Sequence, residues 1–337
     1  MTARLRAGLI GLGMMGRHHA RVLQSLPGVD LVACADPHGD PHGVAGQLPV
    51  LTTVTDIIDA GVDYCVVAVP TAYHYDIAME LANAGVHALI EKPLAATSAE
   101  ANDIVAAFAK AKLIGGVGHI ERYNPALQQA RARLENGELG DVLQVATRRV
   151  GPFPARIADV GVVKDLGTHD IDLTAWVTQQ TYASVSARAA HRSGRPHEDL
   201  ISITGLLSRG SVVNHLVNWL SPMKERVTTI TGEKGAFVAD TISADLTYYA
   251  NGSIPTEWAQ IAGFRGVSEG DMIRYSFAKP EPLRTEHETF ATAVRGEPSA
   301  IVTLAEGART LAVAEACLES AQSGRTVDLN SADPGLA

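Results

Sequence analysis

Short apolar runs alternate with amphipathic segments through the first third of the chain. They predict strands at Arg6–Ile10, Leu31–Ala35, Tyr64–Val69, His87–Ile90 and Leu113–Val117, with a weaker one at Val50–Leu51. The segments between them predict helices at Gly16–Ser25, Val54–Ala60, His74–Ala84 and Ser98–Ala109. Continuous apolar strands that alternate with helices are typical of a parallel sheet covered on both faces. We therefore expect a doubly wound α/β domain in residues 1–122.

The pattern changes near Tyr123–Pro125, and residues 123–337 are expected to form a second domain. Helices are predicted at Ala126–Glu135, Lys164–Thr178, Arg284–Val294 and Leu304–Gln322. Strand-like runs follow one another at Val142–Arg149, Ala183–Ala190, Leu200–Leu207, Ser211–Trp219, Arg226–Thr231 and Leu246–Ala250. Ser202 and Thr204 alternate with Ile201 and Ile203, which is typical of antiparallel strands with one buried face. The second domain is thus predicted to hold a mostly antiparallel, open sheet.

Composition and charge narrow the classes of function. The 337 residues are 46% hydrophobic and 19% charged, and the net charge of −9 argues against binding to nucleic acid or acidic membranes. Cys34, Cys65 and Cys317 lie in apolar stretches, so we expect buried thiols and neither a disulfide framework nor a metal site. No signal peptide or membrane span is apparent, and the cytoplasm is the expected location.

A glycine-rich loop joins the first predicted strand to the first helix. Gly11, Gly13 and Gly16, with Met14 and Met15 between them, form a GxGxxG motif. In this motif the first glycine permits a tight turn, the second lets the backbone approach a pyrophosphate, and the third allows close helix–strand packing. Asp36 stands about 20 residues further on, where a carboxylate binds the adenosine ribose and repels a 2′-phosphate. We predict an NAD site, with NADP less favoured; a glycine-rich turn beside a surface aspartate is the alternative.

Two further motifs follow predicted parallel strands. Pro70-Thr71 follows the strand that ends at Val69, and Glu91-Lys92-Pro93 follows the strand that ends at Ile90. Ligands of open α/β sheets bind at the carboxyl ends of the strands, which makes Lys92 a candidate for chemistry. A solvated lysine in a turn is the alternative.

The helix predicted from Lys164 carries a second group of polar residues. Asp165, His169 and Asp172 are spaced to share one helical face. The apolar positions Leu166, Leu173, Trp176 and Val177 are expected to form a neighbouring buried stripe. A histidine with carboxylates one turn away on each side is suited to proton transfer. The alternative is that Asp165 caps the helix and His169 is an interior residue.

Together these motifs resemble the glucose–fructose oxidoreductase/inositol dehydrogenase/MocA family. The resemblance is carried by Gly11–Gly16, Pro70-Thr71 with His74, Glu91-Lys92-Pro93, and Asp165 with His169, in matching order and spacing. It implies an N-terminal Rossmann domain, a C-terminal α/β domain with an open sheet, and a homodimer or homotetramer formed through that sheet. It also implies a cofactor site that comprises Gly11, Gly13, Met14, Met15, Gly16, Asp36, Pro70, Thr71, His74, Glu91 and Lys92.

One segment departs from the inositol dehydrogenases of this family. Where many of them carry an Arg-Arg-aromatic run, this chain reads His119-Ile120-Glu121-Arg122-Tyr123-Asn124-Pro125. That run is more similar to the branch that acts on nucleotide sugars such as UDP-N-acetylglucosamine at C3. The resemblance implies a substrate site that comprises His119, Glu121, Arg122, Tyr123, Asn124, Arg156, Lys164, Asp165 and His169. Arg148 and Arg149 are further candidates for a substrate phosphate, although arginines in such positions are commonly surface charges.

The resemblance implies hydride transfer between nicotinamide and a hydroxyl carbon of a sugar-like substrate. Lys92 and His169 are the candidate acid–base pair, Asp165 is expected to position the hydroxyl or the histidine, and Lys92 and His169 are expected to converge on the reactive face of the dinucleotide. Other substrates are a cyclitol, a free sugar or a ketosugar that is reduced. A different class, a non-catalytic NAD-binding regulator, stays open, and no metal is expected.

Overall fold

The computed structural model describes residues 4–153, 160–252 and 269–329, which form two compact units. The first unit joins Met1–Tyr123 with Pro280–Ala312, and the second joins Asn124–Lys279 with Val313–Ala337. A single boundary after residue 122 was expected. The chain also returns to the first unit at Pro280 and leaves it again after Ala312.

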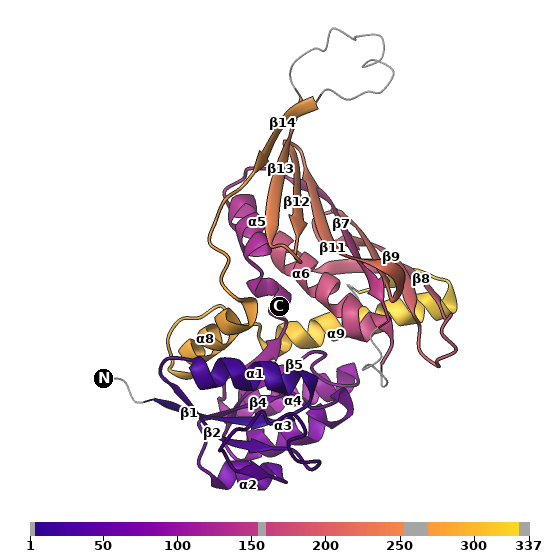
Figure 1. Cartoon of the computed structure of the whole chain (residues 1–337). Helices are drawn as coiled ribbons and strands as arrows, with labels where there is room; N and C mark the ends of the chain where they lie inside the picture. Colours follow the sequence, from indigo (N-terminus) through magenta and orange to yellow (C-terminus); the bar gives the residue numbers. More distant parts are fainter. Residues whose placement is uncertain (1–3, 154–159, 253–268, 330–337) are drawn as a thin grey trace, which may run out of the picture. The chain divides into compact units, whose positions relative to one another are not determined.

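The first unit is built on a parallel sheet of six strands in the order β3-β2-β1-β4-β5-β6. The strands are β1 Leu5–Ile10, β2 Val29–Ala35, β3 Val50–Leu51, β4 Tyr64–Val67, β5 His87–Glu91 and β6 Gly115–Gly118. The helices are α1 Met14–Ser25, α2 Val54–Asp59, α3 His74–Asn83, α4 Ser98–Ala111 and α8 Pro282–Val294 (Figure 1). The predicted doubly wound α/β architecture is confirmed, because the strand order reverses direction at β1.

Local chemistry explains where two of these helices begin. Thr53 and Thr97 each accept a hydrogen bond from a backbone N–H three residues later, and Asp56 and Glu100 return the contact to the threonine N–H. These capping boxes satisfy donors that a helix start otherwise leaves open. The α1 helix differs, since no side chain caps it at Gly13.

The returning segment completes the core of the first unit. Phe290 and Ala291 of α8 pack in the same cluster as Leu9, Ala20 and Leu23, and the Phe290 ring meets Tyr64 edge-on with centroids 5.4 Å apart. Burial of such side chains contributes on the order of 2 kcal/mol each to folding. The segment therefore belongs to this unit by packing, although it is far away in sequence.

The second unit is built on a sheet of nine strands in the order β14-β13-β12-β11-β7-β10-β9-β8-β15. The strands are β7 Val142–Pro152, β8 Tyr182–Ala190, β9 Leu200–Leu207, β10 Val212–Asn218, β11 Leu220–Gly232, β12 Gly235–Asp240, β13 Asp245–Asn251, β14 Glu269–Arg274 and β15 Val327–Asp328. Only β7 and β10 pair in parallel among these neighbours. The predicted mostly antiparallel sheet is confirmed.

Helices cover one face of this second sheet. They are α5 Pro125–Glu135, α6 Thr168–Thr178 and the second half of α9 Leu304–Ser323 (Figure 1). Ile201 and Ile203 point into this core, whereas Ser202 and Thr204 are exposed on the other face. The alternation seen in the sequence therefore reports a sheet with one buried side.

The predicted helix from Lys164 to Thr178 is wrong in its first turn. Val163–Gly167 form a π-helical turn, and the α-helix starts at Thr168. A π turn places more residues in each turn than an α-helix does, so the spacing argument for one continuous polar stripe does not hold there. Such turns are frequently found at functional sites.

All three cysteines are free and buried, as the sequence predicted. Burial raises the pKa of Cys34 to about 11 and the pKa values of Cys65 and Cys317 to about 12. They are protonated packing residues at neutral pH. Among the helices that the structure describes, none is both long and apolar enough to cross a membrane.

Candidate active site

The glycine turn between β1 and α1 requires two of its glycines for steric reasons. Gly11 has a φ of +94°, and a Cβ there would lie 2.6 Å from the Ala68 carbonyl oxygen. A Cβ on Gly16 would lie 2.0 Å from the Gly11 carbonyl oxygen. Any side chain at either position would push the strand and helix apart. Both glycines are thus needed by the fold itself.

Gly13 differs from the other two glycines. A Cβ at Gly13 would meet no atom within 4 Å, and its φ of −71° is accessible to any residue. Gly13 is exposed and sits as the N-cap of α1, with no side-chain cap and no acidic residue in the first turn. Uncapped N–H groups at a helix start are suited to a phosphate. The turn therefore fits a dinucleotide pyrophosphate.

Asp36 is tied to this turn at the end of β2. Its Oδ2 accepts the Leu12 N–H at 2.9 Å, and its Oδ1 accepts the His38 N–H at 2.9 Å. These bonds hold the carboxylate beside the glycine turn while each oxygen keeps a lone pair. Its position agrees with contact to the ribose of a bound dinucleotide.

We expect Gly13→Ala and Gly16→Ala to have different effects. Because the space beside Gly13 is open, Gly13→Ala should preserve the thermal midpoint and weaken NAD binding by about tenfold or more, or about 1.4 kcal/mol. Gly16→Ala should lower the free energy of unfolding by about 1–3 kcal/mol through overpacking. Calorimetric titration with NAD measures the change in binding, and urea unfolding measures the change in stability. Equal loss of stability in both variants would contradict this reading of the turn.

Glu91 and Lys92 stand at the carboxyl end of β5. Glu91 is buried, and its Oε2 accepts the Lys92 backbone N–H at 3.1 Å, while Lys92 itself is half-buried. Burial alone would raise the pKa of Glu91, but a hydrogen bond from His19 and the positive charge of Lys92 outweigh it and hold that pKa below its usual range. An ionised carboxylate is therefore fixed directly behind Lys92.

His74 lies at the start of α3 and is fully buried. Its Nδ1 faces the Pro93 carbonyl oxygen at 2.9 Å, and its Nε2 faces the Val69 carbonyl oxygen at 3.0 Å. Burial lowers its pKa. The ring thus links the loop of Pro70-Thr71 to the loop of Lys92-Pro93. In the structure it positions the predicted cofactor loops, and Thr71 is half-buried in one of them.

Asp165 and His169 belong to the second unit, around the π turn that precedes α6. Both are buried, at 6% and 8% exposure, so each side chain is held by its surroundings. Glu198 organises the start of this turn: its Oε1 accepts the Val163 N–H at 3.0 Å, and its backbone carbonyl accepts the Val162 N–H at 3.0 Å. Glu198 was not singled out from the sequence, because nothing in its local pattern distinguishes it from a surface glutamate.

Arg149 is a correction to the sequence-based expectation. It is 2% exposed, and its Nε donates to Asp170 Oδ1 at 2.9 Å in the core between β7 and α6. A buried, paired guanidinium is committed to the fold. Arg148 points the other way and pairs with Glu225 on the sheet. Both guanidinium groups are thus engaged in ion pairs within the second unit.

The residues predicted to bind the substrate differ in their hydrogen-bond partners and in their burial. Arg122 donates to Glu306 Oε1 at 2.6 Å, and Asn124 caps α5 by accepting the Ala126 N–H at 3.0 Å. Lys164 Nζ lies 3.8 Å from Glu315 Oε1. His119 and Tyr123 are buried and Glu121 is half-buried. Arg156 lies outside the residues that the structure describes.

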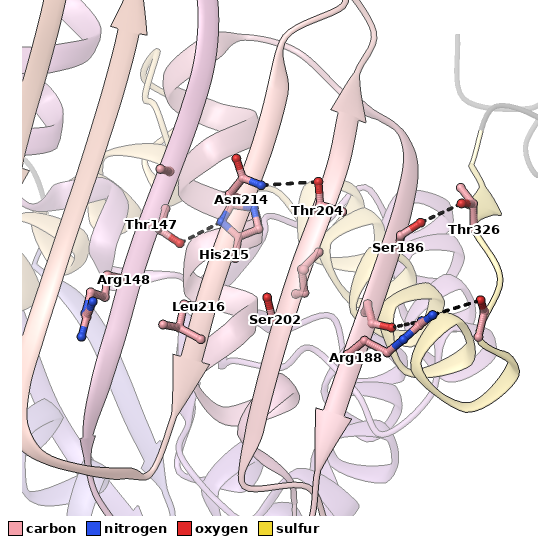
Figure 2. Close-up of a pocket in the computed structure, with 14 residues that line it drawn as sticks. Thr147, Arg148, Ser186, Arg188, Ser202, Thr204, Asn214, His215, Leu216 and Thr326 are labelled. Atoms are coloured by element: carbon pink, nitrogen blue, oxygen red, sulfur yellow. Dashed lines mark hydrogen bonds between the residues drawn. The ribbon is translucent and has the colours of Figure 1, made fainter. Parts of the chain in front are cut away.

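A hollow of about 710 Å³ lies over the second unit's sheet, and Arg148, predicted as a candidate for a substrate phosphate, is among the residues that line it. Figure 2 also shows several short polar side chains in its lining, with Asn214 donating to Thr204 at 3.4 Å and Ser186 bonded to Thr326 at 2.7 Å. His215 lines the hollow as well, but its two ring nitrogens bond to Thr147 and Tyr182, and burial lowers its pKa to about 3. We therefore regard this hollow as a feature of the open sheet face.

A parallel sheet with a GxGxxG turn and a strand-end lysine, followed by an open mixed sheet, defines a dinucleotide-binding oxidoreductase. The model of an oxidoreductase family with an NAD-binding Rossmann fold matches residues 5–119, and that of its C-terminal α/β domain matches residues 131–329. The chain belongs to this family, that of glucose–fructose oxidoreductase, inositol dehydrogenase and MocA, as the sequence motifs indicated.

Named relatives are dehydrogenases of sugars or cyclitols. The chain is 27% identical to UDP-N-acetylglucosamine 3-dehydrogenase of Acidithiobacillus ferrooxidans, over 92% of this chain and 95% of that one. It is 30% identical to inositol 2-dehydrogenase 1 of Saccharopolyspora erythraea, over 98% and 97%. A solved structure of the Acidithiobacillus enzyme matches with a TM-score of 0.83 at 25% identity, over 96% of this chain and 99% of that one.

Proposed function

We propose that this chain is an NAD-dependent dehydrogenase that oxidises a secondary hydroxyl of a nucleotide sugar, in the manner of a UDP-N-acetylglucosamine 3-dehydrogenase. The observation that carries the substrate is the likeness to that enzyme over nearly the whole length of both chains, in sequence and in fold. The His119–Pro125 run, with Glu121 in place of an arginine, supports the same branch.

A cyclitol is the second candidate substrate. The 30% identity to an inositol 2-dehydrogenase over 98% of this chain favours it. The reaction class is the same, since both substrates present a secondary hydroxyl carbon to the cofactor.

The cofactor site supports NAD over NADP. Asp36 places a negative charge beside the glycine turn, where a 2′-phosphate would be repelled. The N–H groups at the start of α1 would hold the pyrophosphate, and the open space at Gly13 admits it. When bound, nicotinamide supplies the hydride acceptor. The preference is checked by comparing dissociation constants of the two dinucleotides for the wild-type chain.

Lys92 is the proposed acid–base residue for the hydroxyl proton. It is half-buried at the carboxyl end of β5 and backed by the carboxylate of Glu91. His169 is proposed as the second proton-handling group and Asp165 as its orienting carboxylate, both held in a buried turn. In the oxidation, the proton leaves the hydroxyl oxygen while hydride leaves the carbon that carries this hydroxyl. His119, Glu121, Tyr123 and Lys164 are proposed to contact the rest of the substrate.

Self-association through the open sheet face is also part of the proposal. Leu206 and Val212 are cross-strand partners on β9 and β10, and 42% and 43% of their surfaces are exposed. Exposed apolar side chains on an uncovered sheet face are typical of an interface between copies of a chain. Light scattering of the purified protein measures the number of copies.

The function is tested by a spectrophotometric screen for NAD reduction. UDP-N-acetylglucosamine, inositols and free sugars are offered to the wild-type chain, with the Gly13→Ala variant as the control deficient in cofactor binding. Reduction with the nucleotide sugar supports the proposal, and reduction only with an inositol supports the second candidate. Tight NAD binding without turnover on any of these substrates would favour a non-catalytic regulator.

A further inference from the structure

Four titratable side chains form a buried cluster within the first unit. They are His19 of α1, Glu91 at the end of β5, and Glu286 and His287 of α8, and none exceeds 9% exposure. Helices α1 and α8 lie side by side in Figure 1, although His19 and His287 are 268 positions apart in sequence. Buried ionisable groups are costly unless they are paired, so such a cluster calls for an explanation.

Both ring nitrogens of His19 make hydrogen bonds within the cluster. His19 Nε2 lies 2.9 Å from Glu91 Oε1, and His19 Nδ1 lies 2.9 Å from His287 Nε2. Because the Glu91 carboxylate only accepts, His19 Nε2 carries a proton and donates it. A row of hydrogen bonds therefore joins His287 through His19 to Glu91.

Glu286, the residue before His287 on α8, is the fourth member of the cluster. Among the described residues, neither oxygen of Glu286 nor the Nδ1 of His287 has a hydrogen-bond partner. Burial raises the pKa of Glu286 well above its ordinary value, and the negative charge of Glu91 adds to this effect. Burial likewise lowers the pKa of His287 well below its ordinary value. These directions describe a neutral acid beside a neutral imidazole.

The groups that face Glu91 come from each element around it. His19 approaches from α1 and His74 from α3, and Lys92 follows Glu91 directly, while Glu286 of α8 is a further titratable group, whose pKa is raised by burial and by the charge of Glu91. On the β6 side stands Gly118, where a Cβ would lie 3.1 Å from the Glu91 carboxyl carbon. Glu91 therefore has little room to move, and among the described residues its buried side-chain donor is His19.

We propose that His287 and His19 are positioning residues: a two-imidazole relay that holds the Glu91 carboxylate in place behind Lys92. This inference rests on the proposed function, since its consequence is the proton affinity of the proposed acid–base group. The relay acts at a distance, because His287 of α8 reaches Glu91 through His19. It explains why a polar row is kept in a core that otherwise consists of apolar side chains.

The test compares two replacements of His287. His287→Leu removes the hydrogen-bond partner of His19 Nδ1, so the His19 ring is no longer held in the orientation in which its Nε2 donates to Glu91. The Glu91 carboxylate then loses its buried donor and is no longer held in its position behind Lys92. His287→Gln keeps an amide N–H at a similar reach and should behave as the wild type. The matched control is Glu288→Gln, the exposed neighbour on the same helix.

The readout is the pH dependence of Lys92 acetylation, followed by mass spectrometry of the full chain. We expect the midpoint for Lys92 to fall by about one pH unit in His287→Leu and to stay unchanged in His287→Gln and Glu288→Gln. The pH profile of kcat should move in the same direction, with little change in KM for NAD. A midpoint that is equal in all three variants would overturn the relay.

Three other outcomes are also covered by the design. A His287→Leu variant that loses its fold leaves the comparison of wild type with His19→Gln and His19→Leu, in which only the leucine should move the Lys92 midpoint. If the midpoint moves as expected but no sugar or cyclitol is oxidised, the relay stands and the proposed function fails. If kcat falls at every pH with an unmoved midpoint, His287 serves packing alone and the relay is wrong.

Discussion

Lys92→Ala is expected to lower kcat for the proposed dehydrogenase about 100-fold or more, the usual cost of losing a general acid–base group. Lys92 is half-buried at the end of β5, where the Glu91 carboxylate stands directly behind it. Alanine removes the amine and leaves the strand and its hydrogen bonds in place. NAD affinity, measured by calorimetry, should change little, because we propose that the glycine turn and Asp36 hold the dinucleotide, and both stay intact in this variant.

Lys92→Arg provides a sharper version of the same experiment. Arginine keeps the positive charge but cannot be deprotonated in a protein, so the variant should be about as slow as the alanine. Lys110→Ala, an exposed lysine of α4, serves as the control with unchanged turnover. Initial rates at saturating NAD and substrate supply the comparison. Wild-type kcat in Lys92→Ala would remove this residue from the chemistry and leave His169 as the candidate.

Local patterns were enough to predict most of the fold. The strands and helices of the first unit follow from apolar runs and from the glycine turn, whose geometry is set by residues close in sequence. Strand β12, Gly235–Asp240, was missed, because it is a short run that becomes a strand by pairing with β11 and β13 on both sides. The two-residue strand β15 exists only by pairing with β8. Such strands depend on their neighbours and leave a weak signal of their own.

The candidate site, like the fold, could be predicted from the sequence only where it is built from residues close together in the chain. The GxGxxG turn and Asp36 are one local unit, whereas the setting of Glu91 is built from His19, 72 positions away, and through it from His287. His19 is buried in the structure, and both of its ring nitrogens make hydrogen bonds. These side chains come together because α8 packs against β1 and α1 within the first unit. The periodicity of the sequence does not reveal this packing.

Glu286→Gln is expected to stabilise the protein increasingly as pH rises. Glu286 is fully buried without a hydrogen-bond partner among the described residues, and burial raises its pKa well above the ordinary value. A raised pKa in the folded state means that folding retains a proton that the unfolded chain releases above about pH 4.3. The wild type therefore loses about 1.4 kcal/mol of unfolding free energy per pH unit, from that pH up to the folded-state pKa.

Glutamine does not titrate, so this contribution to the fall of the unfolding free energy with pH should be absent. The variant should therefore become more stable relative to the wild type as pH rises through the neutral range. Urea unfolding at about pH 5, 6.5 and 8 and constant ionic strength gives the two slopes. Glu288→Gln, one position further along α8 and exposed, should follow the wild type at every pH. Parallel slopes for Glu286→Gln and wild type would mean that Glu286 is ionised in the fold, against the direction in which burial shifts its pKa.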